Sequence, residues 1–235
     1  MLDIHSHLIF DVDDGSRSLE ESINILSMMH EAGVTDMILT PHFIIDSKYM
    51  SSRDNNIYKL NILRDELKKR NIDMNLYLGN EIFMDNKVFD YLKENLISPL
   101  NDTNYILVEL PMSGIYEGYQ DILYSLIHKG YKVILAHPER YISFQKDFNK
   151  VYEVLELGVI LQSNYGSILG DYGLGSKKMI KRLMKENLIT CFSSDIHRLR
   201  SSNFIERAKK KMSKYYTDEE IDNLTKNNML ELINK

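Results

Sequence analysis

The side chains best suited to chemistry in this sequence are histidines and acids that follow short apolar runs. Five of the seven histidines take such positions, and so do three acids: His5, His7, His42, His137 and His197, with Glu81, Glu109 and Asp195. In repeating β/α proteins, functional groups gather at the C-terminal ends of the strands. Imidazoles and carboxylates are common ligands of divalent transition metals. The pattern therefore predicts a multinuclear metal site at one rim of a parallel sheet.

Two pairs of these side chains are spaced by two residues. His5 and His7 form an H-x-H pair at the end of a strand, and Asp195 and His197 repeat the spacing later in the chain. Side chains two positions apart on a strand point to the same face, so both members of a pair can reach one metal. A lone pair would be a modest signal, and the ligands on the other strands corroborate it.

An acidic cluster follows the first pair in the segment FDVDDGS. The segment superficially suggests a calcium loop, but placing Gly15 at the required glycine leaves apolar residues where carboxylates belong. We therefore expect one further metal ligand in this segment. Asp14 is preferred for that role over Asp11 and Asp13, which would form hydrogen bonds or face solvent.

The remaining candidates for chemistry have simpler explanations. In thiol phosphatases, five residues separate the nucleophilic cysteine from an arginine that binds the phosphate. Relative to Cys191, the position of that arginine is occupied by His197, so a nucleophilic cysteine is not expected. Cys191 also lies within a predicted strand, where a small buried apolar side chain is the ordinary role. His30 and His128 fall inside predicted helices, and we assign them no function.

Seven short strands separated by helices are expected to position these residues. The strands are predicted at Leu2–His5, Met37–Thr40, Asn75–Leu78, Tyr105–Glu109, Lys132–Ala136, Val159–Gln162 and Ile189–Ser193. The helices are predicted between a Ser18 cap and a Gly33 stop, at Ser52–Arg70, Lys87–Asn95, Tyr119–Lys129, Gln145–Leu157 and Ser176–Asn187, and twice after Ser202. This alternation predicts an α/β fold whose parallel sheet closes as a (β/α)-type barrel. An open doubly wound sheet is the alternative, but it would spread the ligands along a line.

Length and composition limit the class of protein. The 235 residues contain no linker or internal repeat, so we expect residues 1–235 to form one domain. The chain begins with a predicted strand and has no apolar run long enough to cross a bilayer, so we expect neither a signal peptide nor membrane insertion. Together with the single cysteine, these features favour the cytoplasm. The net charge of −5 argues against a general nucleic-acid binder.

Taken together, the motifs resemble one known superfamily along almost the whole chain. The segments LDIHSH, DVDDGS, TPH, GNEI, LVELP, AHPERY and SSDIH are similar to those of the polymerase and histidinol phosphatase (PHP) superfamily. Within it, the chain resembles the manganese-dependent protein-tyrosine phosphatases of Gram-positive capsule and exopolysaccharide operons (CpsB/CapC-like). The resemblance implies the PHP fold, a distorted seven-stranded, TIM-like (β/α) barrel with three metals at the C-terminal rim of its strands.

The resemblance also implies a role for each candidate residue. The expected ligands are His5, His7, Glu81 and Asp195 for the first metal, Glu81, Glu109 and His137 for the second, and Asp14, His42 and His197 for the third. Glu81 would bridge the first two metals. Arg140 in HPERY matches an arginine with which the family binds phosphate. A second family arginine follows the last D-x-H at a longer spacing, so Arg200 is its preferred counterpart here and Arg198 the alternative.

Such a metal set suits phosphate chemistry. Four carboxylates contribute −4 and three divalent ions +6, so the cluster would carry +2 and attract a phosphate dianion. Nitrogen and oxygen ligands without sulfur suit manganese, iron or zinc, and the oxygen share favours manganese. A hydroxide, formed because the metals lower the pKa of water, can attack phosphorus in line while Arg140 stabilises the phosphoryl oxygens. No covalent phosphoenzyme is needed.

The leading hypothesis is a metal-dependent phosphotyrosyl-protein phosphatase. As the resemblance implies, its substrate would be the phosphotyrosine-containing tail of a membrane-associated tyrosine kinase that controls polysaccharide export. Phe43 and Tyr116, in predicted rim loops, are candidates to flank the tyrosyl ring or are ordinary packing residues. Another phosphoesterase of the superfamily, such as a histidinol phosphatase, is the first alternative. A scaffold with an inactive metal rim is the second, disfavoured because every ligand position is filled.

Overall fold

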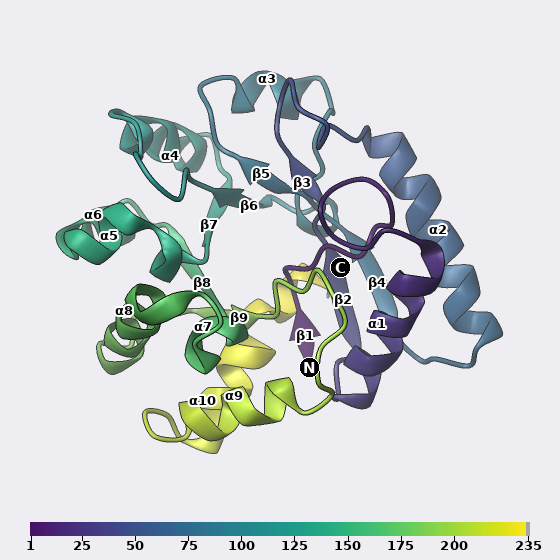
Figure 1. Ribbon diagram of the computed structural model, residues 1–235. Helices are drawn as coiled ribbons and strands as arrows, with labels where there is room; N and C mark the ends of the chain where they lie inside the picture. The colour runs from purple at the N-terminus through teal and green to yellow at the C-terminus, as the bar shows by residue number, and fades with distance from the viewer. Residues whose placement is uncertain (234–235) are drawn as a thin grey trace.

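Short parallel strands alternate with helices in the computed structural model, which describes residues 1–233 (Figure 1). The strands are β1 (Leu2–Asp3), β2 (Asp36–Leu39), β3 (His42–Phe43), β4 (Asn75–Leu78), β5 (Glu81–Phe83), β6 (Tyr105–Glu109), β7 (Lys132–Ala136), β8 (Ile160–Asn164) and β9 (Cys191–Ser193). Each pairing between two of these strands is parallel. The predicted α/β class with parallel strands is therefore confirmed.

The strands form two sheets instead of the single closed sheet expected from the sequence. One sheet has the order β1-β2-β4, and the other has the order β3-β5-β6-β7-β8-β9. An isolated parallel bridge between Ser6 and Ile196 joins the segments that follow β1 and β9. The closed seven-stranded barrel is not confirmed by this hydrogen-bond pattern.

The second and third predicted strands correspond to β2 and β4. Each is followed, after a short break, by another short strand, β3 and β5. Pro41 lies between β2 and β3, where it has no N–H to continue the ladder. Gly79 lies between β4 and β5, and a Cβ at this position would come within 2.5 Å of a leucine side chain. Asn80 links the two breaks, because its side-chain amide donates to the Pro41 carbonyl at 2.9 Å. The new strands then pair His42 with Glu81 in register.

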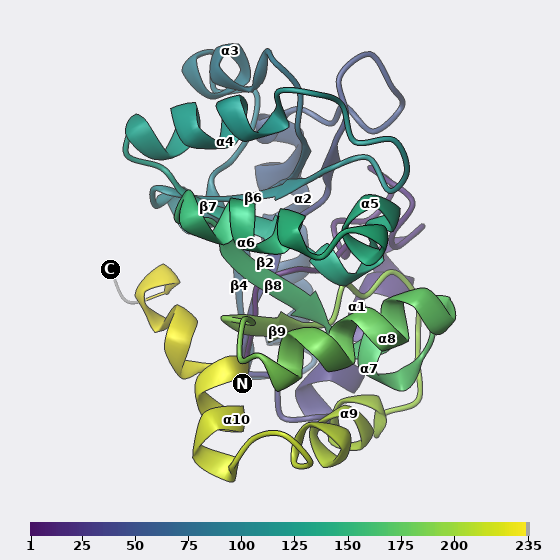
Figure 2. The same ribbon diagram turned by 90° about the vertical axis from the view of Figure 1, so that its left-hand side faces the viewer.

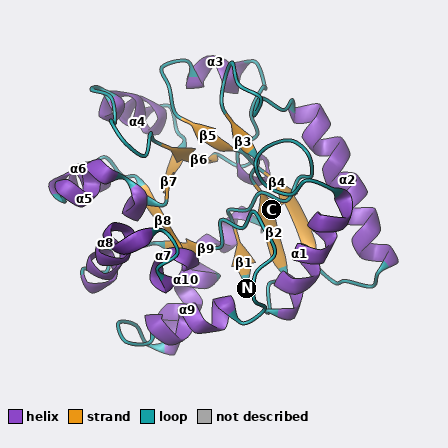
Figure 3. Cartoon of the chain, viewed as in Figure 1, coloured by secondary structure: helices purple, strands orange, loops and turns teal. Residues whose placement is uncertain are grey.

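The helices surround the strands on the outside of the molecule (Figure 3). They are α1 (Leu19–Glu31), α2 (Arg53–Lys69), α3 (Val88–Lys93), α4 (Tyr119–His128), α5 (Ile142–Lys146), α6 (Asn149–Glu156), α7 (Tyr165–Leu169), α8 (Gly173–Lys185), α9 (Phe204–Met212) and α10 (Asp218–Thr225), with 3₁₀ segments at Leu100–Asp102, Pro138–Arg140 and Asn227–Leu232. The predicted helix Gln145–Leu157 is wrong as one element, because Asp147 is extended and separates α5 from α6. The five-residue α7 escaped prediction because it is too short to show a helical period.

Apolar side chains on alternate positions of the strands form two layers. In β6 and β7, Val108 and Leu135 join the large cluster that packs under the helices. Leu107 and Ile134 point the other way, because successive side chains of a strand face opposite sides. This second cluster draws on strands of both sheets and therefore fills the space between them. Among residues 1–233, no helix is both long and apolar enough to span a membrane.

Candidate metal centre

Four side-chain atoms from three strand ends meet in the interior of the protein. Nε2 of His5 lies 3.2 Å from Nε2 of His7 and 3.2 Å from Oε2 of Glu81. Nε2 of His7 lies 3.3 Å from the same Glu81 oxygen. Oδ1 of Asp195 lies 3.5 Å from Nε2 of His5 and 3.4 Å from Nε2 of His7. The four side chains are at most 2% exposed, so the residues expected to bind the first metal converge on one buried point.

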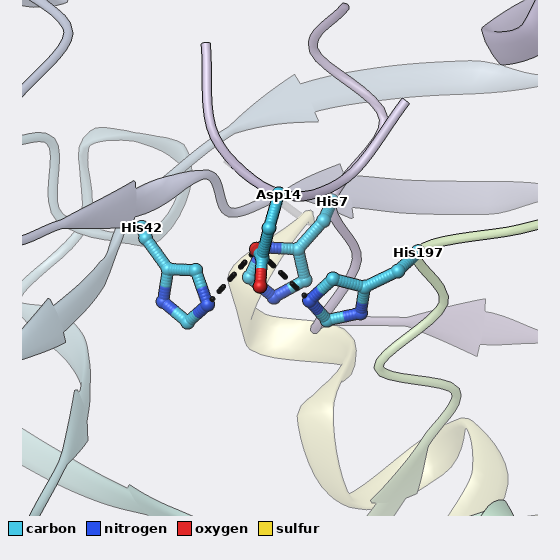
Figure 4. Close-up of side chains that lie close together, drawn as sticks. All are labelled: His7, Asp14, His42 and His197. Carbon is cyan, nitrogen blue, oxygen red and sulfur yellow. Dashed lines mark ion pairs between the residues drawn. The ribbon is translucent and has the colours of Figure 1, made fainter. Parts of the chain in front are cut away.

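A second group lies at the more exposed side of His7 (Figure 4). Oδ1 of Asp14 lies 3.5 Å from Nε2 of His42 and 3.4 Å from Nε2 of His197. The ring of His197 stacks on that of His7 with their centroids 3.9 Å apart. The three residues expected at the third metal are therefore brought together, and His7 joins them.

Glu81 lies between these groups and contacts ligands on both of its oxygens. Its Oε1 is 2.8 Å from Nε2 of His137, while its Oε2 is 3.0 Å from Nδ1 of His42. Oε1 of Glu109 lies 3.2 Å from the same His42 nitrogen. The set expected at the second metal is therefore brought together around Glu81, because Glu109 has a ligand atom within 4.8 Å of one on Glu81 and His137 contacts Oε1.

This cluster fits a group of divalent metals by its donor chemistry and by its unpaired atoms. Nδ1 of His42 and Oε2 of Glu81 are buried and make no hydrogen bond despite their close neighbours. Burying polar atoms without partners is costly, so such atoms commonly face a ligand. The donors are imidazole nitrogens and carboxylate oxygens without sulfur, a set that suits transition metals.

Three further side chains, outside the ligand set expected from the sequence, orient the candidate ligands. Asp13 lies 2.8 Å from Nδ1 of His7, and Gln162 lies 2.8 Å from Nδ1 of His5. In each case the contact directs the Nε2 atom of the ring toward the cluster. Asn164 donates to Oδ2 of Asp195 at 2.7 Å. A sequence signal existed for two of them, because Gln162 and Asn164 share one face at the polar C-terminal end of β8, after Ile160 and Leu161.

The backbone near the cluster adopts conformations that its residue types rarely adopt. His137 and Asp195 have φ values of 38° and 50°, in the left-handed region. Such positions cost energy and concentrate at functional sites. Gly15 is required for another reason, because a Cβ there would lie 2.0 Å from the His7 carbonyl oxygen. Because Gly15 has no Cβ, the acidic loop can fold back over His5 and His7.

Mutual charge interactions dominate the ionisation of the cluster. Burial opposes a proton on His42, but the Glu81 carboxylate raises the pKa of His42 to about 10. Burial likewise opposes a proton on His7, but Asp13 raises the pKa of His7 well above its ordinary value. A hydrogen bond from His197 lowers the pKa of Asp14 to about 2. In the metal-free protein, protons on the histidines therefore balance the negative charge of the carboxylates. These protons must leave when a metal binds the same nitrogens.

Arg140 lies beside the cluster and lines a cavity of about 390 Å³ that opens next to it. Its Nη1 donates to Oδ2 of Asp195 at 2.9 Å, and its guanidinium lies 4.4 Å from the centroid of the Tyr172 ring. The side chain remains 25% exposed. Arg140 can therefore present donors to an anion in this cavity while the acid and the ring fix its position.

Arg198 and Arg200 line the same cavity but differ in their partners. Arg198 donates to the backbone carbonyls of Gly15 and His197. Arg200 instead pairs with the side chain of Asp171. Arg198 ties two loops together through these carbonyls, and its Nε lies 3.9 Å from Oε1 of Glu21, whereas Arg200 can exchange its single acid for a phosphate.

His30, His128, Cys191 and Phe43 take no part in the cluster. His30 lies in α1 and His128 in α4, as predicted. Cys191 is buried in β9, and burial raises the pKa of its thiol, which disfavours a thiolate nucleophile. Phe43 is 2% exposed and packs against Tyr91, so it belongs to the core and does not flank a substrate ring.

The fold and the site together define an α/β protein that carries a candidate multinuclear metal centre at the ends of its parallel strands. Comparison with known proteins identifies the family. Residues 1–234 match the family described as capsular polysaccharide synthesis, CpsB/CapC, and the chain belongs to this family.

Individual relatives agree with this assignment. The tyrosine-protein phosphatase YwqE of Bacillus subtilis is 31% identical over 213 residues, which cover 87% of this chain and 80% of YwqE. A solved structure also matches, with a TM-score of 0.91 and 29% identity. It comes from work described as crystal structures of YwqE from Bacillus subtilis and CpsB from Streptococcus pneumoniae, unique metal-dependent tyrosine phosphatases. That match covers all of this chain and 95% of the other. The histidinol phosphate phosphatase of Lactococcus lactis matches with a TM-score of 0.59 and 15% identity over 91% of this chain and 93% of its own, which shows a shared fold.

Proposed function

We propose that this protein is a metal-dependent protein-tyrosine phosphatase. The observation that carries the proposal is the buried meeting point of His5, His7, Glu81 and Asp195, with Arg140 donating to the last of them. A Lewis acid held by these residues and the guanidinium of Arg140 would both act on a phosphate in the cavity that Asp195 and Arg140 line. YwqE, a member with 31% identity, is named a tyrosine-protein phosphatase, which supports the same activity here.

The ligands that we propose for up to three divalent ions are His5, His7, Asp14, His42, Glu81, Glu109, His137, Asp195 and His197. Manganese is the proposed metal, with iron or zinc as alternatives, because the set combines imidazoles with a large share of carboxylate oxygens. Bound metals would supply Lewis acidity and an activated water for attack on phosphorus. We propose that Glu81 bridges two ions, since both of its oxygens approach imidazole nitrogens.

The protein's own residues bind and orient the substrate. Arg140 donates to the phosphoryl oxygens, and Arg200 assists after exchanging its Asp171 partner for the phosphate. Tyr172, which already stacks on Arg140, forms an aromatic wall for the tyrosyl ring. Phenol has a pKa of about 10 and leaves more readily than an alkyl alcohol, so this site favours phosphotyrosine over phosphoserine.

The proposed substrate in the cell is the phosphotyrosine-containing tail of a membrane-associated tyrosine kinase that controls polysaccharide export. The family's description as capsular polysaccharide synthesis supports this pathway. We further propose that residues 1–235 act as a single phosphatase domain in the cytoplasm. The metal cluster and its arginines would attract phosphate locally, although the net charge of the protein is −5.

Histidinol phosphate is the alternative substrate within the superfamily. The histidinol phosphatase fold matches less well than that of the tyrosine phosphatases, with TM-scores of 0.59 and 0.91. The difference favours the aryl phosphate.

A substrate and metal panel tests the proposal. Purified protein is stripped with a chelator, reloaded with manganese, and assayed on matched phosphotyrosine and phosphoserine peptides and on histidinol phosphate. We expect no turnover without metal, recovery with manganese, and highest kcat/KM on phosphotyrosine. Full activity of thoroughly metal-free protein, or a preference for histidinol phosphate, would contradict the proposal.

A further inference from the structure

A second cavity lies outside the metal cluster, among α7, α8 and the segment formed by α9 and the residues after it. These helices lie on the same side of the molecule in both views (Figures 1 and 2). The cavity has a volume of about 220 Å³ and combines buried apolar side chains with lysines. Its apolar wall includes Ile180 and Met184. Four lysines also line the cavity: Lys177, Lys181, Lys211 and Lys214. We call this cavity the basic pocket.

The positive charge of the basic pocket is not balanced by nearby acids. Among residues 1–233, none of the four lysines forms an ion pair with an acidic side chain. Burial and the neighbouring charge of Lys177 lower the pKa of Lys211. Asp171 is close enough to act on Lys211, but it already pairs with Arg200. An uncompensated cluster of cations on a protein of net charge −5 is suited to an anionic ligand.

Only a short connection separates the basic pocket from the cavity beside the metal cluster. Asp171 and Tyr172, between α7 and α8, line the cavity that contains Arg140. The preceding residue, Gly170, lies beside Lys177 of the basic pocket, because a Cβ built on it would be 3.3 Å from Nζ of Lys177. A ligand whose one end occupies the first cavity can therefore reach the basic pocket by passing over residues 170–172.

We propose that the basic pocket binds a second phosphotyrosine side chain of the peptide whose first phosphotyrosine occupies the catalytic cavity. The volume is below the roughly 300–1,000 Å³ of pockets for drug-sized ligands, so it suits one side chain. Met184 and Tyr215, which line the cavity, contact the aromatic ring, while the lysine ammonium groups bind the phosphate. This inference rests on the proposed function and extends it to substrates that carry two phosphates on one chain.

Kinetics with paired peptides test the basic pocket. Each peptide carries one phosphotyrosine and, two to six residues away on either side, either alanine, glutamate or the non-hydrolysable phosphonate analogue of phosphotyrosine. An extended chain spans about 3.3 Å per residue, so this series covers the separations a short connection permits. With the manganese-loaded protein we expect the best phosphonate peptide to have a KM about tenfold below that of its alanine counterpart, as two or more partly exposed ion pairs would give. The kcat is unchanged, and glutamate gives a smaller effect.

A matched pair of double variants separates the pocket from the general charge of the protein. Lys177→Ala/Lys211→Ala removes one pocket lysine from α8 and one from α9. Lys185→Ala/Lys210→Ala removes two lysines from the same helices that do not line the pocket. We expect the first variant to abolish the advantage of the phosphonate peptide and the second to retain it. Both should hydrolyse p-nitrophenyl phosphate, which has a single phosphate, as the unmodified protein does.

Direct binding keeps this test independent of turnover. Calorimetry measures the affinity of a peptide that carries the phosphonate analogue at both positions for each protein. We expect about tenfold weaker binding to Lys177→Ala/Lys211→Ala than to Lys185→Ala/Lys210→Ala. Equal affinities, or equal KM values for alanine and phosphonate peptides, overturn the basic pocket as a subsite. Failure to hydrolyse any phosphotyrosine peptide while this affinity difference persists would instead refute the catalytic proposal alone.

Discussion

Replacing Asp13 by asparagine should weaken metal binding although Asp13 is not itself a proposed ligand. Its Oδ2 lies 2.8 Å from Nδ1 of His7 and accepts from the backbone N–H of His42 at 3.0 Å, while Oδ1 accepts from the N–H of Gly15 at 2.8 Å. The side chain is fully buried. Asparagine can keep the bond to Gly15, but its NH₂ group then faces the other two N–H groups. His7 avoids this clash by losing the Nδ1 proton and keeping the proton on Nε2, the atom that points into the candidate metal cluster.

The expected loss follows from the role of such orienting groups. Mutating the partner of a metal-binding histidine typically lowers metal affinity 10–100-fold, which is about 1.4–2.7 kcal/mol. The assay is a manganese titration of metal-free Asp13→Asn protein against a chelator of known affinity, with thermal unfolding as a check on the fold. Asp11→Asn is the matched control, because Asp11 is exposed in the same loop and asparagine tolerates its positive φ of 54°. Wild-type manganese affinity in folded Asp13→Asn protein would refute the reasoning.

Other perturbations of the same site have equally definite outcomes. Glu81→Gln should reduce phosphotyrosine turnover more than Asp14→Ala does, because Glu81 contacts ligands through both oxygens; equal losses in a kinetic comparison would contradict a bridging role. Arg140→Lys should lower kcat/KM at least tenfold with metal content unchanged by elemental analysis, because lysine cannot donate two parallel hydrogen bonds. The raised pKa of His42, about 10 against an ordinary value of 6.5, means that metal-free protein holds a proton there at pH 7. Manganese binding should therefore release protons and tighten as pH rises, which calorimetry in buffers of different ionisation enthalpy measures. The same shift stabilises the metal-free fold fully below about pH 6.5 and less as pH approaches 10, so unfolding free energy should fall over that range.

The sequence determined the chemistry of the site because ligand type and strand position are local properties. Each apolar run that ends in a histidine or acid predicts its own strand and rim residue, and parallel strands bring such ends together. His5, His7, Glu81 and Asp195 meet for this reason. The helix that starts after Ser18 is also local: its hydroxyl accepts from the N–H of Glu21, as the capping pattern predicts.

Tertiary structure alone decided what each acid and arginine does when neighbours in the chain have the same chemistry. Asp13 and Asp14 are adjacent, yet the close approach at Gly15 turns Asp13 inward to His7 and leaves Asp14 facing His42. Arg198 and Arg200 likewise differ in what the fold places opposite them.

The sequence determined only part of where the strands end. The break at Pro41 can be predicted from the sequence, because proline has no N–H to donate to the hydrogen-bond ladder of a sheet. At Gly79, which follows β4, the Leu100 side chain occupies the space that a Cβ would need, and the local sequence does not show this contact. Which strands pair, and therefore that the ladders form two sheets and not one closed barrel, depends on residues far apart in sequence, which no local pattern encodes.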